Sequence, residues 1–235
     1  MLKTELHTHC NADPIDYKWV KYSPKDLVNE AIKKKFDVLA ITCHNLVYTN
    51  KELKEYARKK GLLLLFGIER DIEERHTLLY NITQKEAMKI NTFQDLKRAK
   101  ETNKNLIAIS AHPLYPGPAC IGKKGLIKHQ SLFDAWEHSF FHSWFYNPNR
   151  KLIKLAKKYK KPLVGNSDVH VLKDLGRTYS LINSKKTEEA VFQAIKDGKV
   201  KVVTNEVPIH EFLHIAWKFC LSVFRKRILP KLAKS

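Results

Sequence analysis

Nine histidine and acidic residues fall mostly at the ends of separate apolar runs, and this placement constrains the fold more than any other feature of the chain. The set comprises His7, His9, Asp13, His44, Glu69, His76, His112, Asp168 and His170. In a parallel α/β barrel the carboxyl ends of the strands converge on one face, so residues distant in sequence meet there. Residues two apart on a strand share a face, which would bring together His7 with His9 and Asp168 with His170. We therefore interpret the set as a multinuclear metal site.

The alternation of strand-like and helix-like segments predicts an α/β fold in one domain. Strands are expected over 1–9, 36–42, 62–66, 106–110, 162–165, 178–182 and 200–204. Helices are expected over 23–35, 50–60, 93–102, 149–159 and from 185 or 187 to 197. Glu69 should follow its strand directly. The segment 114–130, with two prolines and three glycines, is expected to be an irregular loop, and 132–141 fits either a helix or a strand.

The charge balance is strongly basic, with 43 lysines and arginines against 24 aspartates and glutamates. The formal net charge of +19 favours anionic partners such as phosphate compounds, nucleic acid or a membrane surface, and it equally fits lysine-rich solvated helices. No signal-peptide pattern opens the chain, and no apolar run approaches the roughly 18 residues of a membrane span. The four cysteines, Cys10, Cys43, Cys120 and Cys220, form no Cys-x-x-Cys pair. Free thiols fit a reducing compartment, so we expect a cytoplasmic protein.

Taken in order, the motifs are His7-Thr8-His9 with Asp13 four residues later, Thr42-Cys43-His44, Gly67-Ile68-Glu69, His76, His112-Pro113 and Ser167-Asp168-Val169-His170. This ordered set resembles the polymerase and histidinol phosphatase (PHP) superfamily over nearly the whole chain except its tail. The resemblance implies a distorted (β/α)7 barrel, similar to a TIM barrel, that binds two or three divalent ions of zinc, manganese or iron. It also implies the ligands: His7, His9, Glu69 and Asp168 for one ion, Glu69, His76 and His112 for a second, and Asp13, His44 and His170 for a third.

The sequence departs from the family pattern at two positions. The family usually has Thr-Asp-His where this chain has Cys43 before His44, and Gly-Ser-Asp where it has Asn166 before Ser167. If the usual Asp orients a neighbouring group, a thiol is a weaker replacement, which bears on the third ion. A thiolate ligand at Cys43 would favour zinc. Simple packing of Cys43 is the simpler interpretation.

The resemblance implies a phosphoesterase, a hydrolase acting on phosphate ester bonds. Paired divalent ions can activate water, hold the phosphate and neutralise charge, so we expect a metal-bound hydroxide as nucleophile, with Glu69 and Asp168 as catalytic ligands. Arg177 is expected to be catalytic through a bidentate contact with a substrate phosphate, the alternative being a surface ion pair. His138 and His142 lie in an aromatic stretch that could line the pocket or belong to the core.

The chain is divided into a barrel, residues 1–207, and a basic amphipathic C-terminal helix and tail, residues 208–235. The tail could dock on the barrel, form a dimer contact, or anchor the protein on nucleic acid or peripherally on an anionic membrane. The basic charge favours nucleotides or nucleic-acid ends as the phosphorylated substrate. The alternatives are a small-metabolite phosphatase, such as histidinol phosphatase, and a nucleic-acid-binding accessory protein. The oligomeric state is left open.

Overall fold

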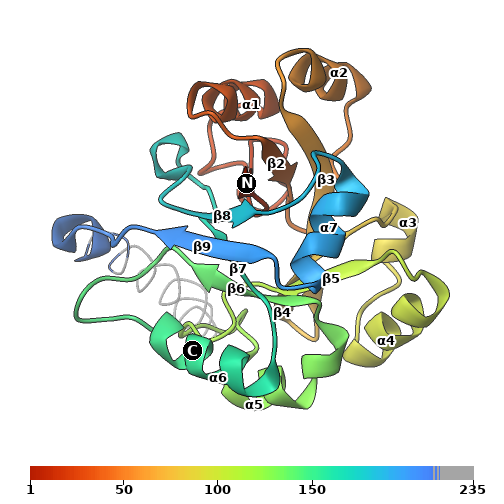
Figure 1. Ribbon diagram of the computed structural model, residues 1–235, viewed down its shortest axis with the longest axis vertical. Coiled ribbons are helices and arrows are strands. Elements are labelled where there is room, and N and C mark those ends of the chain that lie inside the picture. Colours follow the sequence, from red (N-terminus) through yellow and green to blue (C-terminus); the bar gives the residue numbers. More distant parts are fainter. Residues whose placement is uncertain (214, 216, 218–235) are drawn as a thin grey trace, which may run out of the picture.

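The computed structural model describes residues 1–213, 215 and 217. The described strands are β1 (Leu2–Glu5), β2 (Val38–Ile41), β3 (Leu63–Ile72), β4 (Arg75–Tyr80), β5 (Ile107–Ser110), β6 (Ala135–Ser139), β7 (Leu163–Asn166), β8 (Thr178–Ile182) and β9 (Val200–Thr204). The helices are α1 (Pro24–Lys33), α2 (Lys51–Lys59), α3 (Gln84–Ala87), α4 (Phe93–Thr102), α5 (Gly122–Lys128), α6 (Asn149–Tyr159) and α7 (Glu188–Lys196), with 3-10 turns η1 (Gln130–Leu132) and η2 (Leu172–Asp174). Figure 1 shows helices arranged around a curved sheet.

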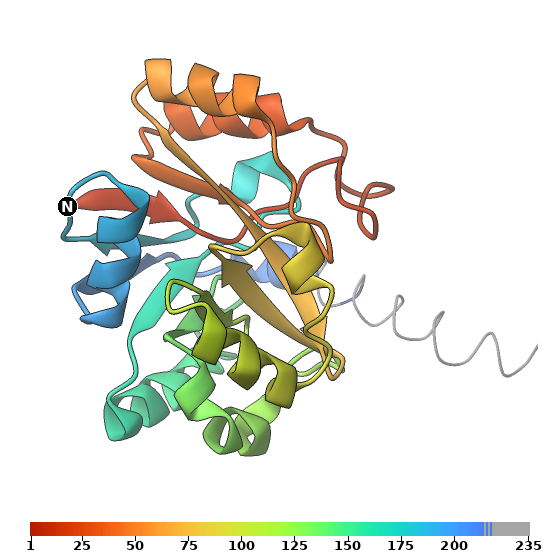
Figure 2. The same cartoon turned by 90° about the vertical axis from the view of Figure 1, so that its right-hand side faces the viewer.

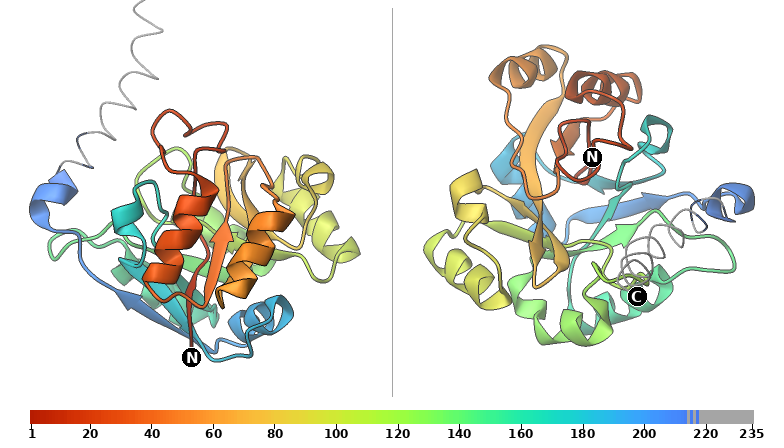
Figure 3. Two further views of the ribbon diagram at one scale, coloured as in Figure 1. Left: turned by 90° about the horizontal axis from the view of Figure 1, so that it is seen from above. Right: turned by 180° about the vertical axis from the view of Figure 1, so that it is seen from behind.

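The sheet has the strand order β7-β6-β5-β4-β3-β2-β1-β8-β9. Strand β4 is antiparallel to both β3 and β5, and β8 is antiparallel to both β1 and β9. The other pairings are parallel, so within the described chain seven strands run in one direction and β4 and β8 run against them. The carboxyl ends of those seven strands therefore open onto one end of the sheet. Figure 3 shows β2 pointing from the side of the N-terminus toward this end.

The two ends of the sheet approach each other and nearly close it into a barrel. At its carboxyl end β7 continues into Val169, which forms a parallel bridge with Thr8 beyond β1. Nearer the middle, the Ser180 hydroxyl accepts a bond from Gly165 N and donates one to Gly165 O, joining β8 to β7. A Cβ on Gly165 would lie 2.8 Å from Val202 Cγ1 and 2.9 Å from Tyr179 O, so only glycine allows this close approach. The result is a distorted α/β barrel.

Three apolar clusters divide the core by position. The interior cluster joins inward residues such as Leu65 and Ile109 to α7, whose Phe192 ring lies 5.0 Å from that of Tyr80. Helix α7 thus covers the amino-terminal opening of the barrel (Figure 1). A second cluster packs α1 and α2 outside β2 and β3, and the third packs α3 to α6 outside β3 to β7. Figure 2 shows these two outer groups of helices on opposite sides of the strands.

Local signals fix where several helices begin. The predicted start of α1 is confirmed, because Ser23 and Asp26 form a reciprocal capping box and Pro24 occupies the first turn. Thr92 and Asp95 form the same box at α4. Helices α4 and α6 and strands β8 and β9 have the predicted bounds.

The distorted-barrel prediction is confirmed, and two local predictions, for Glu69 and for the loop 114–130, were wrong. Glu69 does not follow its strand, because β3 continues to Ile72 and turns into β4, which was not predicted. Helix α5 occupies part of the expected loop 114–130, and the ambiguous segment 132–141 contains strand β6. In the predicted tail helix, residues 209–213 are helical, and most of the remainder lies outside the described residues.

Within the described part of the chain, no helix has the length and apolar character needed to cross a membrane.

Candidate metal centre

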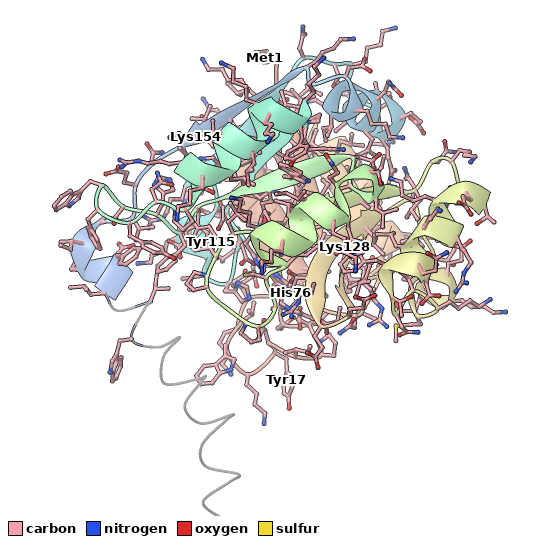
Figure 4. The ribbon with its side chains drawn as sticks, turned by 90° about the horizontal axis from the view of Figure 1, so that it is seen from below. Met1, Tyr17, His76, Tyr115, Lys128 and Lys154 are labelled. Carbon is pink, nitrogen blue, oxygen red and sulfur yellow. The ribbon has the colours of Figure 1, made fainter. Side chains whose placement is uncertain are left out.

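The nine predicted ligands come together at the carboxyl end of the barrel. His7 and His9 leave β1, and a parallel bridge sets His44, after β2, beside Glu69 on β3. His76 enters from the antiparallel strand β4, and His112 and Asp168 follow β5 and β7. Asp168 and His112 both have positive φ, at 46° and 29°, which are costly conformations for non-glycine residues and are concentrated at functional sites. Figure 4 shows His76 toward one end of the molecule and Met1 toward the other.

Four potential ligand atoms lie close together at the carboxyl end of the barrel. They are His7 Nε2, His9 Nε2, Glu69 Oε2 and Asp168 Oδ1. The His7 nitrogen lies 3.3 Å from the glutamate oxygen and 3.4 Å from the aspartate oxygen, and the His9 nitrogen lies 3.4 and 3.3 Å from the same two atoms. Bonds of about 2.1 Å to a tetrahedral ion would separate its ligand atoms by roughly 3.4 Å. The spacing therefore fits a divalent cation.

Unsatisfied buried atoms at the same place support this fit. Among the described residues, His7 Nε2, His9 Nε2 and Asp168 Oδ1 are buried and have no hydrogen-bond partner. Buried polar atoms normally find a partner, because leaving one unpaired costs about 1–3 kcal/mol. A cation bound between them would satisfy all three, so the donor set fits the metal that the motifs imply.

Glu69 faces a second group of imidazoles with its other oxygen. Its Oε1 lies 2.8 Å from His76 Nδ1 and 3.3 Å from His112 Nε2, whereas its Oε2 faces His7 and His9. His44 Nε2 also lies 3.0 Å from Oε2. A fully buried carboxylate between two histidine groups has the geometry of a bridging ligand. The predicted bridge is thus placed where two ions could share it.

The remaining predicted ligands are Asp13, His44 and His170, which lie next to His9. Asp13 Oδ2 is 2.8 Å from His9 Nδ1 and 3.0 Å from His44 Nδ1. His170 faces Asp16, a residue that was not predicted, with its Nε2 3.0 Å from Asp16 Oδ2. The rings of His9 and His170 stack with their centroids 4.4 Å apart.

The structure also reveals supporting residues that the sequence did not single out. Glu137 on β6 is fully buried, and its Oε1 lies 2.9 Å from His7 Nδ1 while its Oε2 accepts a bond from His112 N. Asp71 Oδ1 lies 3.3 Å from His76 Nε2, and Cys120 Sγ lies 3.3 Å from His112 Nδ1. Such contacts to the second ring nitrogen fix the orientation of a ligating histidine. The one sequence signal for Glu137 was its position beside His138, in a stretch that could line the pocket or belong to the core.

The pKa of a buried carboxylate in this region depends on whether imidazoles lie beside it. Burial opposes ionisation of Glu69, but the imidazoles of His76 and His7 hold its pKa well below the usual range. The Glu69 charge in turn overcomes burial and raises the pKa of His76 to about 9. Glu5, beside the cluster on β1, accepts bonds from His7 N and Ser167 N, but burial outweighs these bonds and raises its pKa to about 8. Ionised carboxylates are therefore concentrated where the imidazoles converge.

The two positions that depart from the family pattern have structural explanations. Cys43 is buried in the apolar cluster beneath α1 and α2, with its Sγ 3.6 Å from Cys10 Sγ, which supports the packing interpretation. Asn166 accepts a bond from Leu6 N and donates one of 2.8 Å to Glu137 Oε1. Asn166 therefore helps to hold the glutamate that contacts His7.

The structure does not bring Arg177, His138 or His142 into the cluster. The Arg177 guanidinium bonds to Asp174 at 2.8 Å and to Glu211 at 2.7 Å, which is an ion pair of the kind considered as its alternative. Its contact with a substrate phosphate stays a prediction. The rings of His138 and His142 lie 5.7 Å apart, and His142 Nε2 lies 2.7 Å from the Thr204 hydroxyl.

This geometry places histidine-rich groups that could hold metal ions at the carboxyl end of an α/β barrel. The family model described as PHP domain matches residues 5–157, and the one described as PHP-associated matches residues 147–200. The chain belongs to the PHP family, as its motifs indicated.

Two solved structures have a similar fold. PsfC from Pseudomonas syringae PB-5123 has a TM-score of 0.63 and 13% sequence identity, over 94% of this chain and 98% of PsfC. An amidohydrolase from Chromobacterium violaceum, solved with bound sulfate and no metal, has a TM-score of 0.57 and 14% identity, over 84% of this chain and 97% of its own. No curated protein matches the chain in sequence.

Proposed function

We propose that the chain is a metal-dependent phosphoesterase that hydrolyses phosphate esters, with nucleotides or nucleic-acid ends as its favoured substrates. Membership in the PHP family and the converging ligands support the broader class, a metal-dependent hydrolase. The observation that carries the proposal is the arrangement around Glu69. One carboxylate lies between two imidazole groups, and the imidazoles of one group also lie 3.3–3.4 Å from Asp168 Oδ1.

The buried residues of the centre would hold ions, and the partly exposed ones lie where substrate would enter. His7, His9 and Glu69 are fully or almost fully buried and would hold the ions on the buried side of the centre. The side chains of Asp168 and His170 are 21% and 37% exposed, so the centre opens to solvent on their side. Bound divalent ions would supply activated water and positive charge against phosphate oxygens. Glu137 and Asp71 would keep His7 and His76 oriented during the reaction.

The basic charge of the chain supports the substrate class. A net charge of +19 raises the local concentration of polyanions, and nucleotides and nucleic-acid ends carry several negative charges. Cytoplasmic location and zinc, manganese or iron as the native metal remain predictions that accompany this proposal.

The test is a hydrolysis screen with the metal-loaded full chain. Phosphomonoesters, nucleoside bisphosphates, short RNA and DNA oligomers and a simple amide would be compared after loading with zinc, manganese or iron. We expect phosphate release that is abolished by chelation and by Glu69→Gln, with the highest kcat/KM on nucleotides or oligomer ends. Amide hydrolysis without phosphate release would contradict the proposal.

A further inference from the structure

We propose that Asp16, and not Asp13, supplies the carboxylate that holds a third divalent ion between His44 and His170, while Asp13 is a positioning residue for the ring of His9 and the backbone of His44. The inference rests on the proposed metal-dependent function and changes the ligand assignment that the motifs imply.

The carboxylate of Asp13 is already occupied by donors from the protein. Its Oδ1 accepts bonds from Ile15 N at 2.8 Å and Asp16 N at 2.9 Å. Its Oδ2 accepts one from His44 N at 2.7 Å and lies 2.8 Å from His9 Nδ1. An ionised carboxylate offers about four lone-pair sites, and these four contacts use them. His44 Nδ1, 3.0 Å from Asp13 Oδ2 and 3.4 Å from Asp16 Oδ2, would then keep its lone pair for an ion beside Asp16. Asp13 is fully buried and has little left to offer an ion.

The contacts of Asp13 with His9 have a direct consequence for the ligand set. A histidine whose Nδ1–H donates to a carboxylate presents the lone pair of its Nε2, and His9 Nε2 is the atom that faces Glu69 and Asp168. Asp13 therefore selects the tautomer and the ring orientation of a ligand.

The carboxylate of Asp16 lies among ring nitrogens instead. Its Oδ2 is 3.0 Å from His170 Nε2 and 3.4 Å from His44 Nδ1. Among the described residues, the Asp16 carboxylate lies close to these two imidazoles and accepts no bond from a backbone N–H. His170 Nδ1 lies 2.9 Å from the Asp168 carbonyl oxygen, to which it can donate, so the Nε2 lone pair is directed at Asp16. Two electron-rich atoms 3.0 Å apart need a cation or a proton between them.

The local sequence explains how two carboxylates only three residues apart take different roles. Asp13 Oδ1 closes an Asp turn over Pro14 and Ile15, and Tyr17 N and Val20 N continue the turn by bonding to Asp13 O and Asp16 O. This turn carries Asp16 around to His170, on the more exposed side of the centre. Asp16 is 21% exposed at its side chain, whereas Asp13 is fully enclosed. The third ion would therefore lie nearest to incoming substrate.

The experiment measures metal content and needs no substrate. The full chain, Asp16→Asn and Asp13→Asn would be stripped with a chelator, reloaded with zinc or manganese over a range of concentrations, and analysed for bound ions per chain. We expect three ions in the unmodified protein and two in Asp16→Asn at every concentration. Asp13→Asn should still reach three at saturation, with affinity for at least one ion weakened by roughly 10–100-fold, as is typical when an orienting partner is lost. Asp16→His, which restores a ligand, should return the third ion.

Asp37→Asn is the matched control, because Asp37 is a partly buried aspartate that pairs with Lys186 at the other end of the barrel. It should bind three ions with unchanged affinity. The proposal is overturned if the unmodified protein never binds a third ion, or if Asp13→Asn loses that ion at saturation and Asp16→Asn keeps it. A chain with three ions that cleaves no phosphoester would refute the proposed function and leave this assignment standing.

Discussion

At the scale of single residues, Glu137 connects the metal centre to the barrel wall. Its Oε1 touches His7 Nδ1 and accepts from Asn166, and its Oε2 accepts from His112 N. Glu137→Gln should weaken metal binding by roughly tenfold or more, because the neutral amide no longer favours the His7 tautomer that presents Nε2. Competition with a chromophoric chelator would measure this change.

Glu5→Gln is a close control for that variant. Glu5 is also fully buried and bonds to the backbone N–H of His7, but it does not touch the His7 ring. We expect its metal affinity to stay within a few-fold of the unmodified protein. Equal losses in the two variants would show that burial of a glutamate near His7, and not its contact with the ring, controls affinity.

The sequence could indicate where His9, His44, His112 and Asp168 lie because each follows a buried strand that is visible as an apolar run. It overlooked Glu137 because the surrounding aromatic run fitted both helix and strand, so the inward face of β6 could not be assigned. Asp16 was overlooked for a different reason. It belongs to a turn held by the side chain of Asp13, and its position depends on hydrogen bonds that no periodicity reveals.

At the scale of elements, the β3–β4 hairpin shows why part of the fold could not be predicted. Its turn is made by Glu73 and Glu74, which adopt positive φ of 49° and 62° without glycine, asparagine or proline to signal a turn. The strand residues around it are also rich in charge, because Glu69 and His76 serve the metal centre. Charged and polar residues therefore interrupt the apolar pattern by which a strand is recognised in a sequence.

The junction of β7 with β8 and β9 depends on Gly165. In Gly165→Ala the new methyl group would meet Val202 and the carbonyl of Tyr179, and such overpacking costs about 1–3 kcal/mol of unfolding free energy. Urea denaturation would measure the loss. Adding Val202→Ala should recover only part of it, since the contact with Tyr179 O remains. Full stability in Gly165→Ala would mean that the strands are not closely apposed.

At the scale of the whole molecule, His138 should make stability depend on pH. It neighbours Glu137 on β6 and so points to the opposite face. Burial, reinforced by His142, lowers the pKa of His138 to about 4. The unfolded chain binds this proton near its ordinary pKa of about 6.5, so this stabilising contribution is complete above that pH and is lost as the pH falls toward 4. The loss amounts to roughly 3 kcal/mol.

Denaturation curves of the unmodified protein and His138→Gln over this pH range would test the effect. The difference between their unfolding free energies should change steadily from pH 6.5 down to the lowered pKa of about 4 and should be constant at neutral pH. A difference that is independent of pH would show that His138 titrates normally in the folded protein.

The basic tail bears on nucleic-acid binding by the entire chain. Arg225, Lys226, Arg227 and Lys231 lie outside the described residues, and their role is a prediction from sequence. Neutralising them should weaken oligonucleotide binding and flatten its salt dependence, by about 0.7 in the log–log slope for each lost contact on single strands. Hydrolysis of a small phosphomonoester should be unchanged. If the unmodified protein binds no oligonucleotide at low salt but sediments with anionic liposomes, the tail is a membrane-surface anchor.

The place where the barrel closes is also the place where an ion would bind. His9 N and Val169 N donate backbone hydrogen bonds to Val169 O and His7 O, while much of the rest of the junction is joined through side chains, including the hydroxyls of Ser167 and Ser180. Such a junction should open locally before the continuous ladders do. An ion held by His7, His9 and Asp168 would link the segment after β1 to the segment after β7. Amide hydrogen exchange at Gly165 and Val169 should therefore be fast without metal and slow with it. Metal loading would then determine how often the barrel opens at this junction.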